Sequence, residues 1–304
     1  MRTALVFPGQ GSQRPGMLDA VPELDALERL LDAAEALSGL ELRSIASAGP
    51  DDRLADTSVA QPLLYLADWA WGVTLLQSGV EPFAVAGHSL GELAALAVAG
   101  VFSPEAGLEL VVERSKLMTT AAAARAGTMA AVLGMDGSAV RETIADVEDV
   151  WLANDNAPGQ VVVSGSVDGI AEATAALIDA GARRVVPLAV SGAFHSPMME
   201  SASTAFADLL IGAEFEDARI PVYQNTDPTP ETDGDAIRER LIAQIASPVR
   251  WTEIMQALVA EGPIALIESG PGNVLAGLAK RVEGITALSV ESASLESIVG
   301  EVCS

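Results

Sequence analysis

Cysteine and histidine are scarce in this 304-residue chain. The one cysteine, Cys303, excludes an intrachain disulfide framework and a cysteine-rich zinc site. The two histidines, His88 and His195, are too few for a multi-histidine metal centre. We therefore expect no metal site.

Positive charge is also scarce. The chain has 17 lysines and arginines against 42 acidic residues, which gives a formal net charge of −25. Such a surface repels phosphate backbones and anionic lipid headgroups. We therefore expect neither a nucleic acid nor a membrane as a partner.

The sequence has no uninterrupted apolar run long enough to cross a bilayer. The longest candidate, Phe83–Phe102, contains His88, Glu92 and several glycines, and it predicts a buried strand followed by a helix. Thr3–Phe7 is too short for the apolar part of a signal peptide. We expect a cytoplasmic protein.

Half of the residues are hydrophobic, which is enough for a sizeable core. Helical periodicity alternates with short apolar runs, and this alternation predicts an α/β fold with a mainly parallel sheet and helices on both faces. Ser103 and Pro104 predict the start of a helix, with Ser103 as its N-cap. The predicted strands are Ala4–Phe7, Phe83–Ala86, Pro221–Gln224 and Ile264–Glu268.

The pattern changes near Gly127, where shorter elements follow in the order strand, helix, strand, strand, helix, strand. This order is typical of a ferredoxin-like unit. We predict that this unit occupies residues 127–191 and is inserted into a larger unit of residues 1–126 and 192–304. The predicted strands of the insert are Met129–Leu133, Val150–Ala153, Val161–Ser164 and Arg184–Val190.

Gly87-His88-Ser89-Leu90-Gly91 matches the G-x-S-x-G pattern between a predicted strand and a predicted helix. This context is that of a nucleophile elbow, which makes Ser89 a candidate nucleophile and the larger unit hydrolase-like. The alternative is a helix entrance in which Ser89 is only the N-cap.

A serine nucleophile needs a base. His88 is adjacent to Ser89, and neighbouring side chains diverge on a tight turn, so His195 is the better candidate. A structural histidine that caps a turn is the alternative for His195. No acidic motif identifies a group that orients the imidazole, and a backbone carbonyl could serve instead.

With these residues in view, the chain resembles the malonyl-CoA:acyl carrier protein transacylases, the malonyltransferases of type II fatty acid synthesis. It is also similar to the acyltransferase domains of polyketide synthases. The resemblance runs nearly end to end, and its specificity comes from the order of the matching segments: Phe7–Gln13, Thr57–Pro62, Gly87–Glu92, Val111–Met118, Asn156–Gln160, Gly192–Ser196, Gln244–Trp251 and Glu268–Gly272.

The resemblance implies a ping-pong mechanism through an acyl-serine, with Ser89 as the nucleophile and His195 as the base. The backbone N–H groups of Gln10 and Leu90 would form the oxyanion hole, and the main-chain carbonyl of Gln244 would orient His195. Exchange of one thioester for another needs no cofactor. An imidazole with a pKa near neutral pH would serve both half-reactions.

Arg114 would bind the free carboxylate of the malonyl group. The alternative from the sequence alone is a helix-surface arginine that pairs with Glu109 or Glu113. Ser115 stands where the family commonly has glycine, and we expect only a slight local shift from it.

Phe194 and Leu90 are the residues that accompany malonyl, and not methylmalonyl, specificity in the related polyketide domains. We expect Asn156 to line the cleft between the two units.

The resemblance also implies the partners, which are malonyl-CoA and acyl carrier protein, and we expect a monomer. A carrier protein is itself acidic, so a local basic patch must dock it on this acidic enzyme. The candidates by charge are Arg183, Arg184, Arg250, Lys280 and Arg281.

Three other functions stay open at this point. The first is malonyl loading of a dedicated carrier in polyketide assembly or malonate decarboxylation. The second is a serine thioesterase or esterase, although those enzymes usually place the histidine near the C-terminus. The third is a non-catalytic scaffold that kept the fold.

Overall fold

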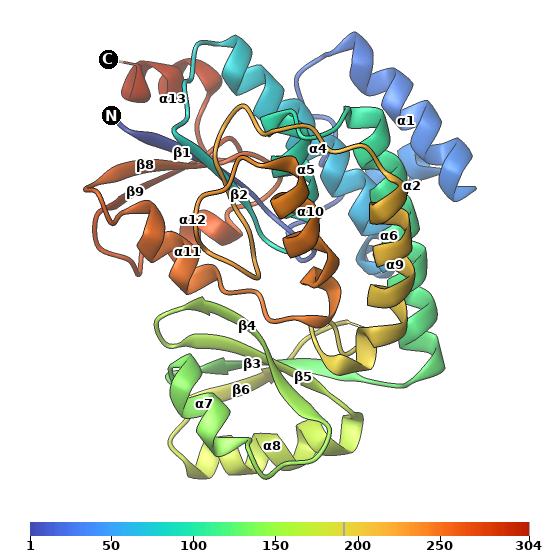
Figure 1. Ribbon diagram of the computed structural model, residues 1–304, viewed down its shortest axis with the longest axis vertical. Helices are drawn as coiled ribbons and strands as arrows, with labels where there is room; N and C mark the ends of the chain where they lie inside the picture. Colours follow the sequence, from blue (N-terminus) through green and yellow to red (C-terminus); the bar gives the residue numbers. More distant parts are fainter. Residues whose placement is uncertain (191, 304) are drawn as a thin grey trace.

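A five-stranded parallel sheet forms the centre of the larger unit in this computed structural model, which describes residues 1–190 and 192–303 (Figure 1). The strands lie in the order β7-β2-β1-β8-β9. Every neighbouring pair is parallel, which confirms the predicted sheet. The strands are β1 (Thr3–Phe7), β2 (Ala84–Gly87), β7 (Val222–Tyr223), β8 (Ile264–Glu268) and β9 (Ile285–Ser289).

Helices cover both faces of this sheet, as predicted. Leu5 and Phe7 of β1 belong to one buried core, together with residues of α4 (Thr57–Gln77), α5 (Gly91–Ala99) and α6 (Pro104–Ala124). Ala4 and Val6 belong to a second core, together with residues of α11 (Trp251–Leu258) and α12 (Val274–Ala279). This alternation is the side-chain period of a strand that is buried on both faces.

The other helices of the larger unit pack around these layers. Ser103 accepts a hydrogen bond from the Ala106 N–H at the start of α6, which confirms the predicted N-cap. The remaining helices are α1 (Asp25–Ser38), α2 (Leu42–Ala48), α3 (Asp51–Ala55), η1 (Pro197–Met199), α9 (Glu200–Gly212), α10 (Gly234–Ile242), η2 (Gln244–Ala246) and α13 (Leu295–Val302). None of the helices in the described residues combines the length and the hydropathy that a membrane crossing requires.

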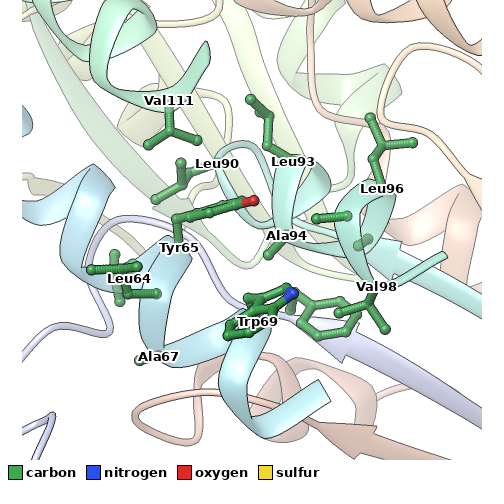
Figure 2. Close-up of a cluster of buried hydrophobic side chains, with 14 of the residues drawn as sticks. Leu64, Tyr65, Ala67, Trp69, Leu90, Leu93, Ala94, Leu96, Val98 and Val111 are labelled. Carbon is green, nitrogen blue, oxygen red and sulfur yellow. The ribbon is translucent and has the colours of Figure 1, made fainter. Parts of the chain in front are cut away.

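Close packing between α4, α5 and α6 fixes the helix that follows the predicted elbow. Figure 2 shows Tyr65 and Trp69 of α4 among leucines, alanines and valines of α5 and α6. The Tyr65 hydroxyl donates a hydrogen bond to the Pro104 carbonyl at 2.9 Å. A Cβ atom at Gly107 would lie 2.2 Å from the Tyr65 hydroxyl oxygen, so a glycine is what lets the two helices approach this closely.

The smaller unit is an antiparallel four-stranded sheet that carries two helices on one face, below the larger unit in Figure 1. The strand order is β4-β5-β3-β6, which is the ferredoxin-like order that the sequence predicts. The elements are β3 (Thr128–Leu133), α7 (Gly137–Thr143), β4 (Val150–Ala157), β5 (Gln160–Gly165), α8 (Val167–Asp179) and β6 (Arg184–Pro187).

The elements of the smaller unit span residues 128–187 without interruption. The predicted boundaries at residues 127 and 191 stay predictions, and Ser191 and Ser304, the ends of two predicted ranges, lie outside the described residues. Two backbone hydrogen bonds join β4 to the larger unit, from the Asp155 N–H to Val249 and from the Val249 N–H to Ala153.

Three strands differ from their predicted lengths or positions. β4 continues to Ala157 and forms a tight hairpin with β5, in which Gly159 has a φ of +74°. β6 ends at Pro187, earlier than predicted, although the Leu188 N–H still donates a hydrogen bond to the Met129 carbonyl of β3. The sequence did not predict β9, an edge strand that is only half-buried.

Candidate active site

Ser89 lies at a sharp turn between β2 and α5, where its backbone has a φ of +53°. Such a left-handed conformation is unfavourable for a residue with a side chain, and it is typical of functional turns. A Cβ atom at Gly87 would lie 1.9 Å from the Gly91 carbonyl carbon, and one at Gly91 would lie 2.1 Å from the Phe7 oxygen. The turn therefore requires both glycines of the motif.

Asn225, the second residue after β7, forms hydrogen bonds with two residues of this turn. Its Oδ1 accepts a hydrogen bond from the Ser89 N–H at 2.7 Å, and its Nδ2 donates one to the Gly87 carbonyl at 2.6 Å. The buried carboxylate of Glu92 accepts a hydrogen bond from the Asn225 N–H at 2.8 Å and one from the Gln224 side chain at 3.1 Å. Hydrogen bonds from the segment after β7 and from α5 thus hold Ser89 in its strained conformation.

The imidazole of His195 is within hydrogen-bond reach of this serine. The distance from Ser89 Oγ to His195 Nε2 is 2.7 Å, and the ring is 4% exposed. His195 Nδ1 lies 3.1 Å from the main-chain carbonyls of Gln244 and of Ser247. A carbonyl can only accept a hydrogen bond, so Nδ1 carries the proton and the Nε2 lone pair faces the serine hydroxyl. His195 itself has a φ of +55°, a second strained residue at the same place.

Burial, and after it the positive charge of Arg114, lowers the pKa of His195 to about 3. The imidazole is therefore neutral at physiological pH, and its free nitrogen is available as an acceptor. The expectation of a pKa near neutral pH was wrong, because the sequence does not show that the ring is buried beside a guanidinium.

Arg114 of α6 is fully buried and points at the serine. Its guanidinium donates hydrogen bonds to Gln61 Oε1 at 2.8 Å, to Gln244 Oε1 at 2.9 Å and to Ser89 Oγ at 3.2 Å. Within residues 1–190 and 192–303, no carboxylate forms an ion pair with it, and its Nε has no partner. The alternative of a surface pair with Glu109 or Glu113 is wrong, and burial lowers the pKa of Arg114 to about 10.

One cavity of about 380 Å³ joins these groups. The predicted site residues that line it are Gln10, Ser89, Leu90, Arg114, Asn156, Phe194 and His195. Gln244 does not line the cavity but contacts three residues that do, through its main-chain oxygen and both atoms of its side-chain amide. The structure thus brings every predicted site residue to one place.

The N–H groups of Gln10 and Leu90 have no protein acceptor in the described part of the chain. A Cβ atom at Gly9 would lie 2.5 Å from the His88 oxygen, so the loop that carries Gln10 packs directly against the elbow. Two free backbone donors at the rim of one cavity are the arrangement that stabilises a tetrahedral oxyanion.

His88 turns away from the serine, as predicted, and joins the two units. Its Nε2 lies 2.8 Å from Asn156 Oδ1 on β4, and its ring packs edge-on against Trp251 at 5.5 Å between centroids. Burial lowers the pKa of His88. The described residues contain no group of three or more histidine, cysteine or acidic side chains placed to hold a metal ion.

Comparison with known proteins decides the family. The acyl transferase domain family matches residues 4–302 of this chain. The malonyl CoA-acyl carrier protein transacylase of Synechocystis is 44% identical over 282 residues, which cover 92% of this chain and 94% of that protein. The Escherichia coli transacylase is 39% identical over 297 residues, 96% of each chain.

The chain belongs to the malonyl-CoA:acyl carrier protein transacylase family.

Solved structures of the family have the same fold. An acyl carrier protein S-malonyltransferase of Vibrio cholerae aligns with a TM-score of 0.91 at 38% identity, over 98% of this chain and 100% of that one. A malonyl-transacylase solved with its type II polyketide synthase acyl-carrier protein aligns with a TM-score of 0.92 at 36% identity, over 99% and 100% of the two chains.

Sequence reasoning missed four residues of this transacylase site: Gln61, Glu92, Asn225 and Ser247. Gln61, Glu92 and Ser247 lie inside segments that carry the family resemblance, where each reads as an ordinary polar residue. Asn225 follows a strand of only two residues and matches no motif. A polar residue at the carboxyl end of a parallel strand was the one available signal for it.

Proposed function

We propose that this transacylase transfers a malonyl group from malonyl-CoA to the phosphopantetheine thiol of acyl carrier protein, through a malonyl-Ser89 intermediate, and that it supplies fatty acid synthesis. One observation carries the proposal. Ser89 Oγ lies 2.7 Å from the neutral His195 Nε2 and 3.2 Å from the buried Arg114 guanidinium, with which no carboxylate of the described residues forms an ion pair.

In the first half-reaction, Ser89 Oγ attacks the thioester carbonyl carbon while His195 Nε2 takes the hydroxyl proton. Negative charge develops on the carbonyl oxygen, and the N–H groups of Gln10 and Leu90 stabilise it. Loss of one such donor typically lowers kcat about 100- to 1,000-fold. The intermediate then expels the sulfur of coenzyme A, which takes the proton from His195 and leaves as the thiol.

In the second half-reaction the same groups work in reverse. The thiol of the carrier gives its proton to His195 Nε2 and attacks the malonyl-Ser89 carbonyl carbon. Collapse of this intermediate breaks the ester bond, and the imidazole returns the proton to Ser89 Oγ. The main-chain carbonyls of Gln244 and Ser247 hold the ring in the one tautomer that can do this.

Arg114 selects the acyl group in this proposal. The planar guanidinium binds the malonyl carboxylate in two parallel hydrogen bonds. An acetyl group would leave the guanidinium buried and without a counter-charge. Phe194, which is 6% exposed, and Leu90 line the same cavity and would limit the space for a methyl branch on the malonyl group.

The carrier would dock near the β4–β5 hairpin. The Arg281 guanidinium donates a hydrogen bond to the Pro158 carbonyl on this hairpin, and Arg183 lies against Gly134, whose N–H bonds to Gly159. Lys280 and Arg184 are neighbours of these arginines and are exposed. Arg250 pairs with Glu253, which offsets part of its charge.

Intact-mass analysis tests the proposed function. After mixing with malonyl-CoA, the wild-type enzyme should gain one malonyl group, and Ser89→Ala should gain none. Addition of a phosphopantetheinylated carrier should then move the group to the carrier. Release of free malonate without a thiol acceptor would indicate a thioesterase, and a wild-type enzyme that stays unlabelled would indicate a non-catalytic scaffold.

A carrier of polyketide assembly is the second candidate acceptor. The observation that favours it is the similarity to the malonyl-transacylase that was solved with a polyketide synthase carrier. The transfer rate from malonyl-Ser89 to a panel of carrier proteins distinguishes the two candidates. The faster carrier identifies the pathway.

We expect the reaction to need no cofactor, because Ser89, His195 and two backbone donors supply the nucleophile, the base and the charge stabilisation. A titration with a chelator during malonyl loading tests this expectation. The monomeric state and the cytoplasmic location stay predictions.

A further inference from the structure

The side-chain amide of Gln244 contacts two parts of the site at once. Its Oε1 accepts a hydrogen bond from Arg114 at 2.9 Å, and its Nε2 donates one to the Ser89 carbonyl at 2.8 Å. The guanidinium can only donate and the carbonyl can only accept, so the two ends of the amide cannot be exchanged. The residue is 1% exposed at the start of η2.

The Ser89 carbonyl belongs to the same peptide group as the Leu90 N–H. A peptide group is planar, and in the trans form its C=O and N–H point in opposite directions. The described chain has no cis peptide bond, so the Gln244 hydrogen bond to the carbonyl also sets the direction of the Leu90 N–H. It polarises that N–H as well, because hydrogen bonds in a chain strengthen one another.

The Ser89 carbonyl has one other donor, the Glu92 N–H at 3.2 Å. That bond is longer and belongs to the first turn of α5, whereas the Gln244 bond comes from a distant part of the chain. Rotation of the Ser89–Leu90 peptide would break the Gln244 bond in a buried place, where a polar group without a hydrogen-bond partner is unfavourable.

We propose that the Gln244 side chain is a positioning residue that holds the Leu90 N–H toward the developing oxyanion and, with the other end of the same amide, holds Arg114 at the acyl group. This inference rests on the proposed function and adds a role for the side chain to that of the main-chain oxygen. It ties carboxylate recognition to the oxyanion hole through one residue.

Two substitutions distinguish the effect of the Gln244 contact with Ser89 from the effect of its contact with Arg114. Gln244→Glu keeps an acceptor for Arg114 and removes the donor to the Ser89 carbonyl and to the Glu92 carboxylate, which also forms a hydrogen bond with this amide. Gln61→Glu is the matched control, because Gln61 contacts the same guanidinium and the Met118 sulfur but no atom of the elbow. Both variants place a carboxylate against Arg114, and both should lose preference for malonyl-CoA over acetyl-CoA to a similar extent.

Acetyl-CoA is the decisive substrate, because its acyl group needs no contact with Arg114. Single-turnover loading of Ser89 is followed by quenched intact-mass analysis. The acetyl-loading rate of Gln244→Glu should be at least fivefold below that of Gln61→Glu, since only the first variant loses the hydrogen bond to the elbow. A difference smaller than fivefold would overturn the proposal.

A second pair keeps the test valid if a buried carboxylate prevents folding. Gln244→Met and Gln61→Met remove the amides without adding charge, and the same fivefold difference in acetyl loading is expected between them. Thermal melting identifies the folded pair. Malonyl loading of the wild-type enzyme, measured in the same series, tests the proposed function separately. A wild-type enzyme that fails to load malonyl would contradict that function, whatever the ratio of acetyl-loading rates between the Gln244 and Gln61 variants.

Discussion

The guanidinium of Arg114 is buried without a carboxylate partner in the described residues, which is costly unless a substrate supplies the charge. Arg114→Ala should therefore lower kcat/KM for malonyl transfer by about 100- to 5,000-fold, which corresponds to the roughly 3–5 kcal/mol of a broken buried pair. Transfer of an acetyl group should fall far less. Parallel kinetics with malonyl-CoA and acetyl-CoA check this, and equal losses on the two substrates would contradict the assigned role.

His195 should stay neutral far below the usual pKa of an imidazole, because burial and the Arg114 charge both disfavour its protonated form. Nitrogen-15 NMR of the imidazoles measures this directly, since the chain has only two histidines and a His88→Asn variant assigns them. We expect the His195 signals to keep the neutral, Nδ1-protonated pattern down to pH 5. A titration with a midpoint near 6.5 would show that the ring is not buried as described.

The sign of this pKa shift also bears on stability. The unfolded chain binds a proton at His195 below about pH 6.5, and the folded chain does not until about pH 3. The contribution of His195 to stability is therefore lost as the pH falls through this window.

Single residues were predictable from the sequence where local geometry dictates them. Ser89 and Gly87 form a local pattern, because a Cβ atom at Gly87 would meet Gly91 four residues later, whereas Gly91 is required by the close approach of Phe7 on β1. The side-chain contacts of Gln244 and Asn225 join residues 155 and 136 positions apart in the chain, and no local pattern encodes such contacts.

At the scale of elements, the strand-to-helix turn depends on the end of β7. Asn225→Ala would leave the Ser89 N–H and the Gly87 carbonyl without their side-chain partner. We expect malonyl loading to fall at least tenfold and the free energy of unfolding to fall by about 2–6 kcal/mol, the sum of two unpaired buried groups. Preference for malonyl over acetyl should stay within about twofold, in contrast to Arg114→Ala. A lost preference would mean that Asn225 also shapes the acyl pocket.

The first turn of α5 carries a pH-dependent group. Burial raises the pKa of Glu92 from 4.5 to about 7, so the folded state holds a proton that the unfolded state has lost between these values. Stability should therefore fall as the pH rises through this window. Glu92→Gln lacks the group that titrates in this window. The free energy of unfolding of this variant, relative to that of the wild type, should therefore rise by about 3 kcal/mol from pH 4.5 to pH 8. Urea unfolding at both pH values measures it, and a constant difference would contradict the shift.

Helices and strands could be predicted from the sequence where they are buried and where their apolar residues recur in a regular pattern. The central strands of the parallel sheet are examples, because burial on both faces gives β1 and β8 continuous apolar runs. Helix α6 is another example. β9 and the second half of β4 did not follow. β9 is a half-buried edge strand, and β4 carries Asn154 and Asn156 on its way past the cavity, so polar residues that serve the site obscured the strand pattern.

At the scale of the whole molecule, the net charge of −25 opposes the approach of an acidic carrier. Attraction must then come from a few cations at the cavity entrance. Arg281 donates a hydrogen bond to Pro158, which lies in the chain between the cavity-lining residues Asn156 and Gln160. Local attraction against long-range repulsion makes docking depend on where a charge lies, and not only on the total charge.

Reversal of Lys280 and Arg281 to glutamate should therefore raise the KM for carrier protein at least fivefold and leave malonyl loading from malonyl-CoA within about twofold, because docking contributes to association and not to chemistry. The control reverses Arg29 and Lys116, which are exposed on α1 and α6 and line no part of the cavity. Each double variant changes the net charge from −25 to −29, since each reversal replaces +1 by −1. Equal effects of the two pairs would show that total charge alone governs carrier binding. A KM that rises only for Lys280 and Arg281 would place the docking surface beside the β4–β5 hairpin.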